Sequence, residues 1–315
     1  MSAGHISVMI REVLFGLNLR DGGTYIDGTF GRGGYTRAIL DAAKTRVFGI
    51  DRDPTAITFG SNLVATYDGR LTLLHGRFGD MESLLAKEGV TQVDGVMLDL
   101  GVSSPQIDDP DRGFSFRLDG PLDMRMEHEG VTAADFINKA PEEEIADVIF
   151  QYGDERYSRR IARGIIAARK INPILSTFQL VRIIHANVRR SKDGIDPATR
   201  TFMALRIQVN DELGELERGL MGAQRILGPG GRLAVVAFHS LEDRKVKSFL
   251  YKHSGSAAKG SRHMPDNLSL NFEPSFNLIK RGIIRPSIDE VTLNPRARSA
   301  RLRVAERTIA PPWFD

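Results

Sequence analysis

Cysteine is absent from this chain of 315 residues, which excludes disulfides, cysteine-ligated zinc, iron–sulfur clusters and a thiol nucleophile. No run of 18 apolar residues occurs, and the first apolar stretch is interrupted by Arg11 and Glu12, unlike a secretory signal. Hydrophobic residues make up 41% and charged residues 26%, which excludes a disordered or collagen-like chain. We therefore expect a folded cytoplasmic protein that does not enter a membrane.

A strong excess of one charge is also missing, because 43 basic residues oppose 40 acidic ones, a net charge of +3. The balance conceals a segregation along the chain. Residues 107–155 hold 14 acidic and 4 basic residues, a local charge of −10, whereas residues 156–206 hold 12 basic and 2 acidic residues, a local charge of +10. A third block, 280–307, has 8 basic and 3 acidic residues. Basic blocks of this kind are typical of nucleic-acid-binding surfaces, although solvated helix faces give the same pattern.

Short apolar strands alternate with helical stretches in the first hundred residues. The predicted strands are 24–29, 46–51, 71–75 and 93–99, followed much later by 232–238 and a last, antiparallel strand within 297–307. Strands that alternate with helices at this spacing predict an α/β fold with a parallel, doubly wound sheet and right-handed crossovers.

The alternation stops for about a hundred residues, where the periodicity is helical. Three glutamates at 142–144 suit the start of one helix, and Ser176 suits the cap of another. Apolar residues at steps of three and four from Phe202 to Leu220 predict one long helix. We predict a helical insertion, 107–200, in an α/β domain formed by 1–106 and 201–315, and a mobile loop at 255–276.

A glycine-rich turn, DGTFGRGG at residues 27–34, follows the first strand at the sheet edge where doubly wound folds bind ligands. The spacing is not that of a dinucleotide fingerprint, because Gly31 and Gly33 are followed by Thr36 where a small residue is required. Asp27 beside the turn and Asp51 at the end of the second strand suit S-adenosylmethionine instead. Its cationic methionine end favours a carboxylate, and its ribose diol needs a paired acceptor.

Each candidate cofactor residue also has a structural reading. Asp51 could cap the helix that begins near Pro54. Phe78, after the third strand, could stack on an adenine or belong to the core. Asp99, at the end of the fourth strand, could accept a hydrogen bond from the adenine amino group.

A Ser-Pro loop follows the fourth strand, where amino-methyltransferases carry a short Asp/Asn/Ser-Pro-Pro-aromatic sequence. In that position Ser103, Ser104 and Pro105 would accept hydrogen bonds from an exocyclic amine and orient its lone pair, which requires positioning rather than a covalent catalyst. Alternatively, they only shape the cofactor loop. His239 and Ser240, after the strand at 232–238, are candidate substrate contacts, although a lone histidine is more often structural.

Several long motifs together resemble the ribosomal small-subunit RNA methyltransferase H family, formerly called MraW. They are DGTFGRGG, FGIDRDP, LDLGVSSPQID, DRGFSF with PLDMRM, PATRTFMALRIQVNDEL, FHSLEDRKVK and NPRARSARLR. The resemblance spans nearly the whole chain. It implies a class I, Rossmann-like methyltransferase fold with an inserted helical domain. It also implies S-adenosylmethionine-dependent N4-methylation of a cytidine in 16S rRNA, at the decoding-centre P site of the small ribosomal subunit.

The family's motifs carry its functional residues onto particular positions. The cofactor contacts implied by the resemblance are Gly33, Gly34, Tyr35, Asp51, Phe78, Asp99 and Gln106. Tyr35 stands where the family usually has histidine, so we expect its contact to be made by the backbone, with a side chain free to vary. We expect Arg189 and Arg190 of the basic block to bind RNA phosphate, with the 107–200 insertion as the RNA-recognition domain.

The sequence also bears on oligomeric state, metals and alternative functions. A homodimer is possible, and no catalytic metal is expected, because the seven histidines show no ligand spacing such as H-E-x-x-H. A nicotinamide-dependent dehydrogenase would use the same sheet and an acid at Asp51. A non-enzymatic RNA-binding module would explain the basic block but not the acids that end the strands.

Overall fold

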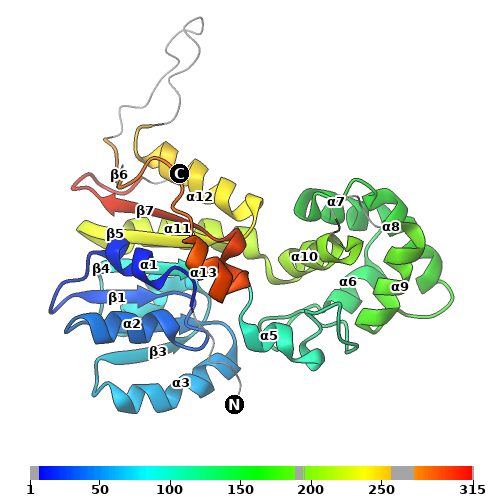
Figure 1. Ribbon diagram of the computed structural model, residues 1–315, viewed down its shortest axis with the longest axis horizontal. Coiled ribbons are helices and arrows are strands. Elements are labelled where there is room, and N and C mark those ends of the chain that lie inside the picture. The colour runs from blue at the N-terminus through cyan, green and yellow to red at the C-terminus, as the bar shows by residue number, and fades with distance from the viewer. Residues whose placement is uncertain (1–6, 189–193, 195, 257–272, 314–315) are drawn as a thin grey trace, which may run out of the picture. The chain divides into compact units, whose positions relative to one another are not determined.

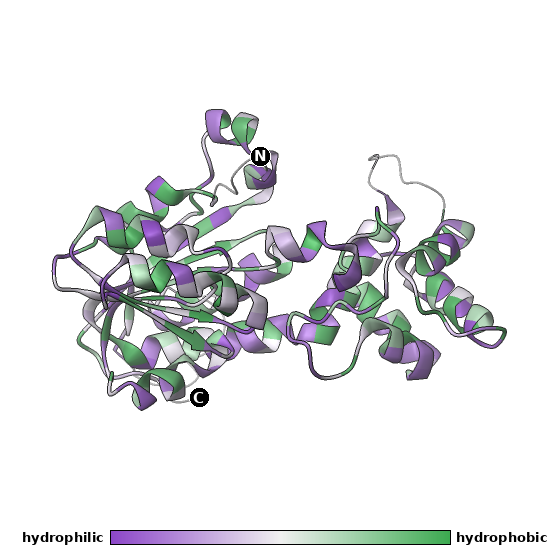
Figure 2. Ribbon diagram, turned by 90° about the horizontal axis from the view of Figure 1, so that it is seen from below, coloured by the Kyte–Doolittle hydropathy of each residue, from purple (hydrophilic) through white to green (hydrophobic). Residues whose placement is uncertain are grey.

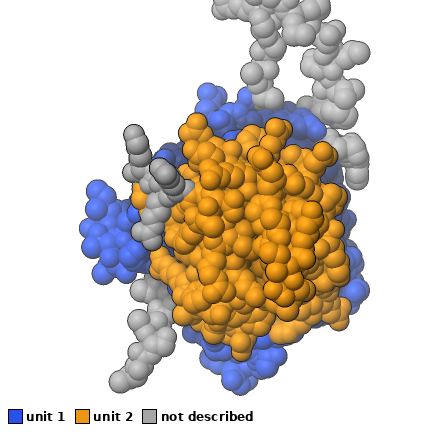
Figure 3. All heavy atoms as spheres, turned by 90° about the vertical axis from the view of Figure 1, so that its right-hand side faces the viewer, with its two compact units in different colours: residues 1–101, 213–315 blue, residues 102–212 orange. Residues whose placement is uncertain are grey.

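The computed structural model describes residues 7–188, 194, 196–256 and 273–313 (Figure 1). The chain divides into two compact units, which Figure 3 colours separately: unit 1 comprises residues 1–101 and 213–315, and unit 2 comprises residues 102–212. Unit 2 is longer than the predicted insertion, because it includes the Ser-Pro loop and a helix that extends beyond residue 200. None of the helices among the described residues has the length and apolar character needed to cross a membrane.

Within the described residues, the strands of unit 1 form one seven-stranded sheet in the order β3-β2-β1-β4-β5-β7-β6. Their bounds are β1 (Thr24–Asp27), β2 (Arg46–Asp51), β3 (Leu71–His75), β4 (Val93–Asp99), β5 (Leu227–Ala237), β6 (Phe276–Leu278) and β7 (Arg301–Arg307). Strands β1 to β5 pair in parallel, whereas β7 runs antiparallel between β5 and β6. The predicted doubly wound α/β sheet is therefore confirmed.

Three details of the sheet differ from the prediction. Strand β5 begins at Leu227, because the glycine-rich segment continues the pairing with β4 across a register shift between Val93 and Gly95. Strand β7 begins only at Arg301, since residues Pro295–Ser299 form a 3-10 helix. Strand β6 lies at the end of the predicted mobile loop, most of which (257–272) falls outside the described residues.

Helices pack on both faces of the sheet and give unit 1 three layers (Figure 1). One face is covered by α1 (Ile10–Leu17), α2 (Gly34–Ala42) and α3 (Pro54–Thr66), and the other by α4 (Met81–Lys87), α11 (Glu212–Ile226) and α12 (Ser240–His253). Side chains of strand β4 alternate between the two faces. Met97 lies in the core beneath α1, α2 and α3, whereas Val96 and Leu98 lie in the core beneath α4, α11 and α12. A short helix, α13 (Ile288–Leu293), precedes the 3-10 helix.

Unit 2 is helical in its described residues, with its own hydrophobic core (Figure 2). Its helices are α5 (Ser104–Asp108), α6 (Ala133–Lys139), α7 (Glu142–Gly153), α8 (Ser158–Arg169), α9 (Thr177–Asn187) and α10 (Pro197–Asn210). Ser176 caps α9 as predicted, accepting a hydrogen bond from the Gln179 backbone N–H. The predicted single helix from Phe202 to Leu220 is wrong, because Asp211 adopts a left-handed conformation with φ 49° and separates α10 from α11.

The buried side chain of Asn210 holds a loop against the end of α10. Its Oδ1 accepts from the Met126 backbone N–H at 2.8 Å, and its Nδ2 donates to the Met124 carbonyl at 2.7 Å. Met124 itself has a positive φ of 63°, so the loop needs such an anchor. The PLDMRM and VNDEL sequences are thus joined in one structural element.

Candidate functional site

The candidate site of unit 1 lies at the carboxyl edge of the parallel strands. Strands β1, β2 and β4 each end in an aspartate: Asp27, Asp51 and Asp99. Strand β1 lies between β2 and β4, so the strand order reverses beside it, and ligands of doubly wound folds bind at such a reversal. The structure therefore brings together the three acids that the sequence selected at separate strand ends.

Asp27 is fully buried and organises the glycine turn. Its Oδ2 accepts from the Thr36 backbone N–H at 3.1 Å and from the Thr36 hydroxyl at 2.7 Å, while its Oδ1 accepts from the Thr29 N–H at 3.3 Å. Burial raises the pKa of this carboxyl to about 6, and the Thr36 hydrogen bonds oppose that shift. Its oxygens are thus already engaged in holding the turn to the first residues of α2.

Asp51 joins the glycine turn to the residues after β2. Its Oδ2 accepts from the Gly31 N–H at 2.7 Å, and its Oδ1 accepts from the Asp53 N–H at 2.8 Å. Burial raises the pKa of Asp51 to about 6. The alternative that Asp51 caps α3 is wrong, because Asp53 is the cap and accepts from the Thr55 N–H at 2.9 Å. Each Asp51 oxygen can still accept another hydrogen bond.

The glycine turn requires glycine for two separate reasons. Gly31 and Gly33 have φ values of +51° and +70°, which residues other than glycine rarely adopt. Gly34 begins α2 under the N-terminal segment, and a Cβ there would lie 1.9 Å from the Ser7 hydroxyl oxygen. The turn is thus closely packed where the first N–H groups of α2 emerge.

Tyr35 has a buried side chain with a structural partner. The side chain is only 3% exposed, packs in the core between the sheet and α1, and donates its hydroxyl to the Val8 carbonyl at 2.5 Å. Burial, followed by the negative charge of Asp99, raises the pKa of the hydroxyl well above its usual range. The ring is therefore held in place and anchors the backbone at Val8, while the contact of the Tyr35 backbone with the cofactor stays a prediction.

Asp99 has a buried carboxylate oxygen, Oδ1, without a hydrogen-bond partner among the described residues. Its backbone N–H donates to the Thr29 hydroxyl at 2.7 Å, which links β4 to the glycine turn. Burial raises the pKa of Asp99 well above its usual range, the charges of Asp27 and Glu242 raise it further, and Tyr35 opposes the shift. An orphaned buried acceptor costs stability in the free protein, so a ligand that donates a hydrogen bond fits this position.

Phe78 opens a 3-10 turn (Phe78–Asp80) directly after β3 and is half-buried. Its ring rests on α11, because a Cβ on Gly219 would come within 2.4 Å of the ring, and its Cβ lies against Gly28 of the turn. The ring therefore packs on the core beside the glycine turn, and its contact with an adenine stays a prediction.

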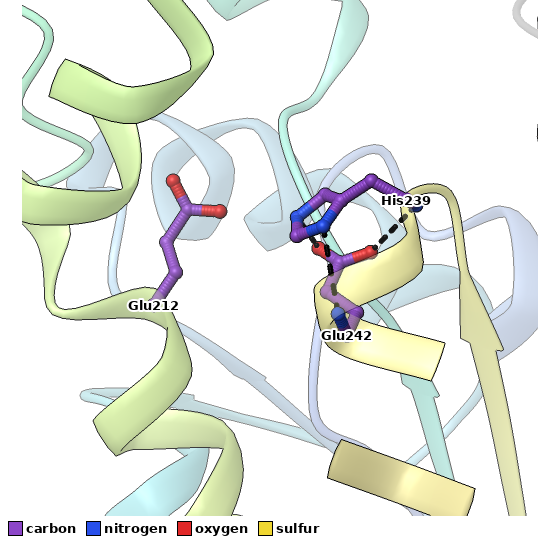
Figure 4. A group of neighbouring side chains, drawn as sticks. All are labelled: Glu212, His239 and Glu242. Carbon is purple, nitrogen blue, oxygen red and sulfur yellow. Dashed lines mark hydrogen bonds and ion pairs between the residues drawn. The ribbon is translucent and has the colours of Figure 1, made fainter. Parts of the chain in front are cut away.

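His239 lies at the start of α12, beyond the end of β5 (Figure 4), and Ser240 is the first residue of that helix. Glu242 accepts from the Phe238 and His239 backbone N–H groups at 2.8 and 3.2 Å. His239 Nε2 lies 3.0 Å from Glu242 Oε1, within ion-pair range but outside hydrogen-bonding geometry. His239 thus has a structural role as the N-cap of α12, whereas Ser240 is exposed. Sequence reasoning missed Glu242, although the His-x-x-Glu spacing of a capping box was the available signal.

The predicted residues of the Ser-Pro loop belong to unit 2. Ser103 is the N-cap of α5, and its backbone N–H donates to the buried Gln106 side chain at 3.0 Å. Ser104 and Pro105 form the first turn of that helix. The contacts that we expect of these four residues stay predictions, and Arg189 and Arg190 lie outside the described residues.

The parallel sheet, the glycine turn and the three acids that end neighbouring strands define the class: a Rossmann-like methyltransferase that uses S-adenosylmethionine. Comparison with known proteins then gives the family, since the model of the MraW methylase family matches residues 2–308. The chain belongs to this family, as the sequence motifs indicate. It is therefore neither a dehydrogenase nor a non-enzymatic RNA-binding module.

Two relatives have the name ribosomal RNA small subunit methyltransferase H. The protein of Paramagnetospirillum magneticum is 58% identical over 309 residues, which are 98% of this chain and 97% of the relative. That of Rhodospirillum centenum is 60% identical over 307 residues, 98% of this chain and 93% of the relative. Among solved structures, a putative rRNA methylase from Clostridium thermocellum is 14% identical, with a TM-score of 0.45 over 97% of this chain and all of the other.

Proposed function

We propose that this protein transfers a methyl group from S-adenosylmethionine to the N4 amino group of a cytidine in 16S rRNA, at the decoding-centre P site. The identity of about 60% to relatives named as small-subunit rRNA methyltransferases, over nearly their whole length, carries the assignment to this RNA. The sequence motifs resembling that family support the choice of N4 and of the P site.

The residues of unit 1 fit the cofactor at several points. The free lone pairs of Asp51 suit the two ribose hydroxyls, and the unpaired oxygen of Asp99 suits an amino group of the cofactor. The first N–H groups of a helix lack intrahelical acceptors, so those of Gly34 and Tyr35 suit the methionine carboxylate. Phe78 offers a ring to the adenine. Gln106, which the family resemblance adds to this set, belongs to unit 2.

The amine of cytosine is a weak nucleophile, because its lone pair is delocalised into the ring. The bound cofactor supplies an electrophilic methyl group. The protein therefore has to hold the amine nitrogen in line with the methyl carbon and keep the nitrogen lone pair directed at that carbon. We assign that positioning to Ser103, Ser104 and Pro105, which follow Asp99 closely in the sequence. His239 and Ser240 would contact the substrate. The amine loses one proton when the new carbon–nitrogen bond forms.

Methyl transfer to ribosomal RNA tests the proposal directly. Purified protein and labelled S-adenosylmethionine are incubated with whole small subunits or naked 16S rRNA, and the modified nucleoside is mapped by mass spectrometry. We expect one N4-methylcytidine at the P site in at least one of the two substrates. A methyl group on another base, or on N3, C5 or O2′ of cytidine, would refute the proposed specificity.

A further inference from the structure

The turn between α7 and α8 in unit 2 exposes two aromatic rings. Phe150, in the last turn of α7, is 57% exposed, and Tyr157, the N-cap of α8, is 53% exposed. Within the described part of the chain, neither ring stacks on another aromatic side chain or lies beneath a cation. More than half of each ring is thus left open to solvent.

Four arginines follow Phe150 and flank Tyr157 in the sequence, and all of them are exposed: Arg156, Arg159, Arg160 and Arg163. None of the four has a carboxylate within ion-pair distance among the residues described. Two of them, Arg159 and Arg160, lie in the first turn of α8, where cations oppose the helix dipole and cost stability. The fold therefore does not account for this concentration of positive charge.

The backbone beneath the rings is held firmly. Glu155 is only 2% exposed, and its Oε1 accepts from the Tyr157 N–H at 2.8 Å, while its Oε2 lies 3.6 Å from Arg200 of α10. Gly153 packs so closely on α10 that a Cβ there would lie 2.7 Å from the Arg200 carbonyl oxygen. Tyr157 is thus an exposed ring on a fixed backbone, which lowers the entropic cost of binding a flat ligand.

We propose that Phe150, Tyr157 and the four arginines, here called the α7–α8 surface, bind an unpaired strand of RNA. The inference rests on the proposed function, since it names the part of unit 2 that would hold the substrate. Unpaired bases stack on exposed aromatic rings, and arginines bind the phosphates between them. Base-paired RNA fits this surface less well, because its bases are stacked on one another and only its phosphates remain available.

The contribution of stacking is tested by anisotropy with the full chain and a labelled oligocytidylate of about 12 nucleotides. Tyr157→Ala should weaken binding by about fivefold or more, the lower end of the loss for one stacked base, whereas Tyr157→Phe should bind like the wild type. Ile171→Ala is the control, because Ile171 is an exposed apolar residue of unit 2, 81% accessible, that cannot stack.

The arginines should contribute phosphate contacts rather than stacking, and such contacts are measured by the salt dependence of the RNA affinity. Replacing Arg159 and Arg160 by glutamine should reduce the slope of log Kd against log salt by about 0.7 for each lost phosphate contact. Tyr157→Ala should leave that slope unchanged. Lys170→Gln, an exposed cation beyond the other end of α8, should alter neither quantity.

Two results would overturn the inference. In the first, Tyr157→Ala binds the oligocytidylate with wild-type affinity. In the second, Tyr157→Ala loses affinity for whole small subunits but not for the oligocytidylate, which would assign the surface to a ribosomal protein. Methyl transfer by the wild type is measured in parallel. If the wild type modifies rRNA while Tyr157→Ala binds RNA normally, the assignment of RNA binding to the α7–α8 surface is wrong and the proposed function stands. If binding depends on Tyr157 but no cytidine is methylated, the proposed function fails instead.

Discussion

The elevated pKa of Asp51 predicts that cofactor affinity depends on pH in a range where most carboxylates do not titrate. If the ribose hydroxyls donate to Asp51, binding requires its ionised form. Because the pKa of Asp51 is raised to about 6, protonation of the free protein competes with binding below that pH. S-adenosylhomocysteine is a suitable probe, since its own groups keep their charge between pH 5 and 7.

The size of the effect follows from a single proton. With a pKa of about 6, nearly all Asp51 is ionised at pH 7 and about a tenth at pH 5, so the dissociation constant should rise about tenfold, or 1.4 kcal/mol. Asp27 titrates in the same range, with a pKa of about 6 that the charge of Asp51 helps to raise, so its protonation broadens the transition. The loss of affinity does not reflect unfolding. The folded protein binds more protons at these carboxyls than the unfolded chain between about pH 4 and 6, so they stabilise the fold as the pH falls.

The assay is calorimetric titration of S-adenosylhomocysteine at pH 5, 6 and 7, with circular dichroism confirming the fold at each pH. Asp51→Asn should bind more weakly at pH 7, because its amide cannot accept from Gly31 and Asp53 and also from two hydroxyls, and its pH profile should be shallower. Asp41→Asn, an exposed acid on α2, should retain the wild-type profile. A wild-type dissociation constant that stays constant from pH 7 to pH 5 would refute the assignment of Asp51.

Three further predictions concern separate parts of the chain. Asp99→Ala should lower the affinity for S-adenosylhomocysteine by tenfold or more in calorimetry without lowering the melting temperature, since it removes a buried acceptor that lacks a partner; unchanged affinity would contradict this. Tyr35→Phe should destabilise unit 1 by about 1–3 kcal/mol in urea denaturation, because it leaves the Val8 carbonyl unpaired, yet change cofactor affinity by less than about threefold. Asn210→Ala should cost about 2 kcal/mol or more in the same assay, because two buried backbone groups lose their partner, whereas Gln151→Ala, at an exposed position, should cost about 0.5 kcal/mol or less.

The sheet and its ligand edge could be predicted because both follow from local patterns. Short apolar runs that end in Asp27, Asp51 and Asp99 are visible in the sequence, and the parallel arrangement places their carboxyl ends at one edge. Helix starts were equally readable where a cap and its partner lie three residues apart, as at Ser176.

What could not be predicted depends on partners far apart in the chain. The role of Asp51 in holding the glycine turn rests on the Gly31 N–H, which it engages from 20 residues away. Tyr35 is fixed by the Val8 carbonyl, 27 residues before it. The break at Asp211 has no local signal either, because the apolar steps of three and four continue across it.

The opposite charges of residues 107–155 and 156–206 differ in how far the fold accounts for them. The glutamates at 142–144 lie in the first turn of α7, where negative charge is favourable, and Asp135 completes the capping box of α6 with Thr132 and pairs with Lys139. Acidic residues of this block thus stabilise helix starts. The arginines at the start of α8 occupy the corresponding positions with the unfavourable sign, and they have no acidic partners among the described residues. These arginines cost the fold stability without an acidic partner in the described part of the chain, which supports the proposal that they, rather than the acidic residues of unit 2, face the RNA.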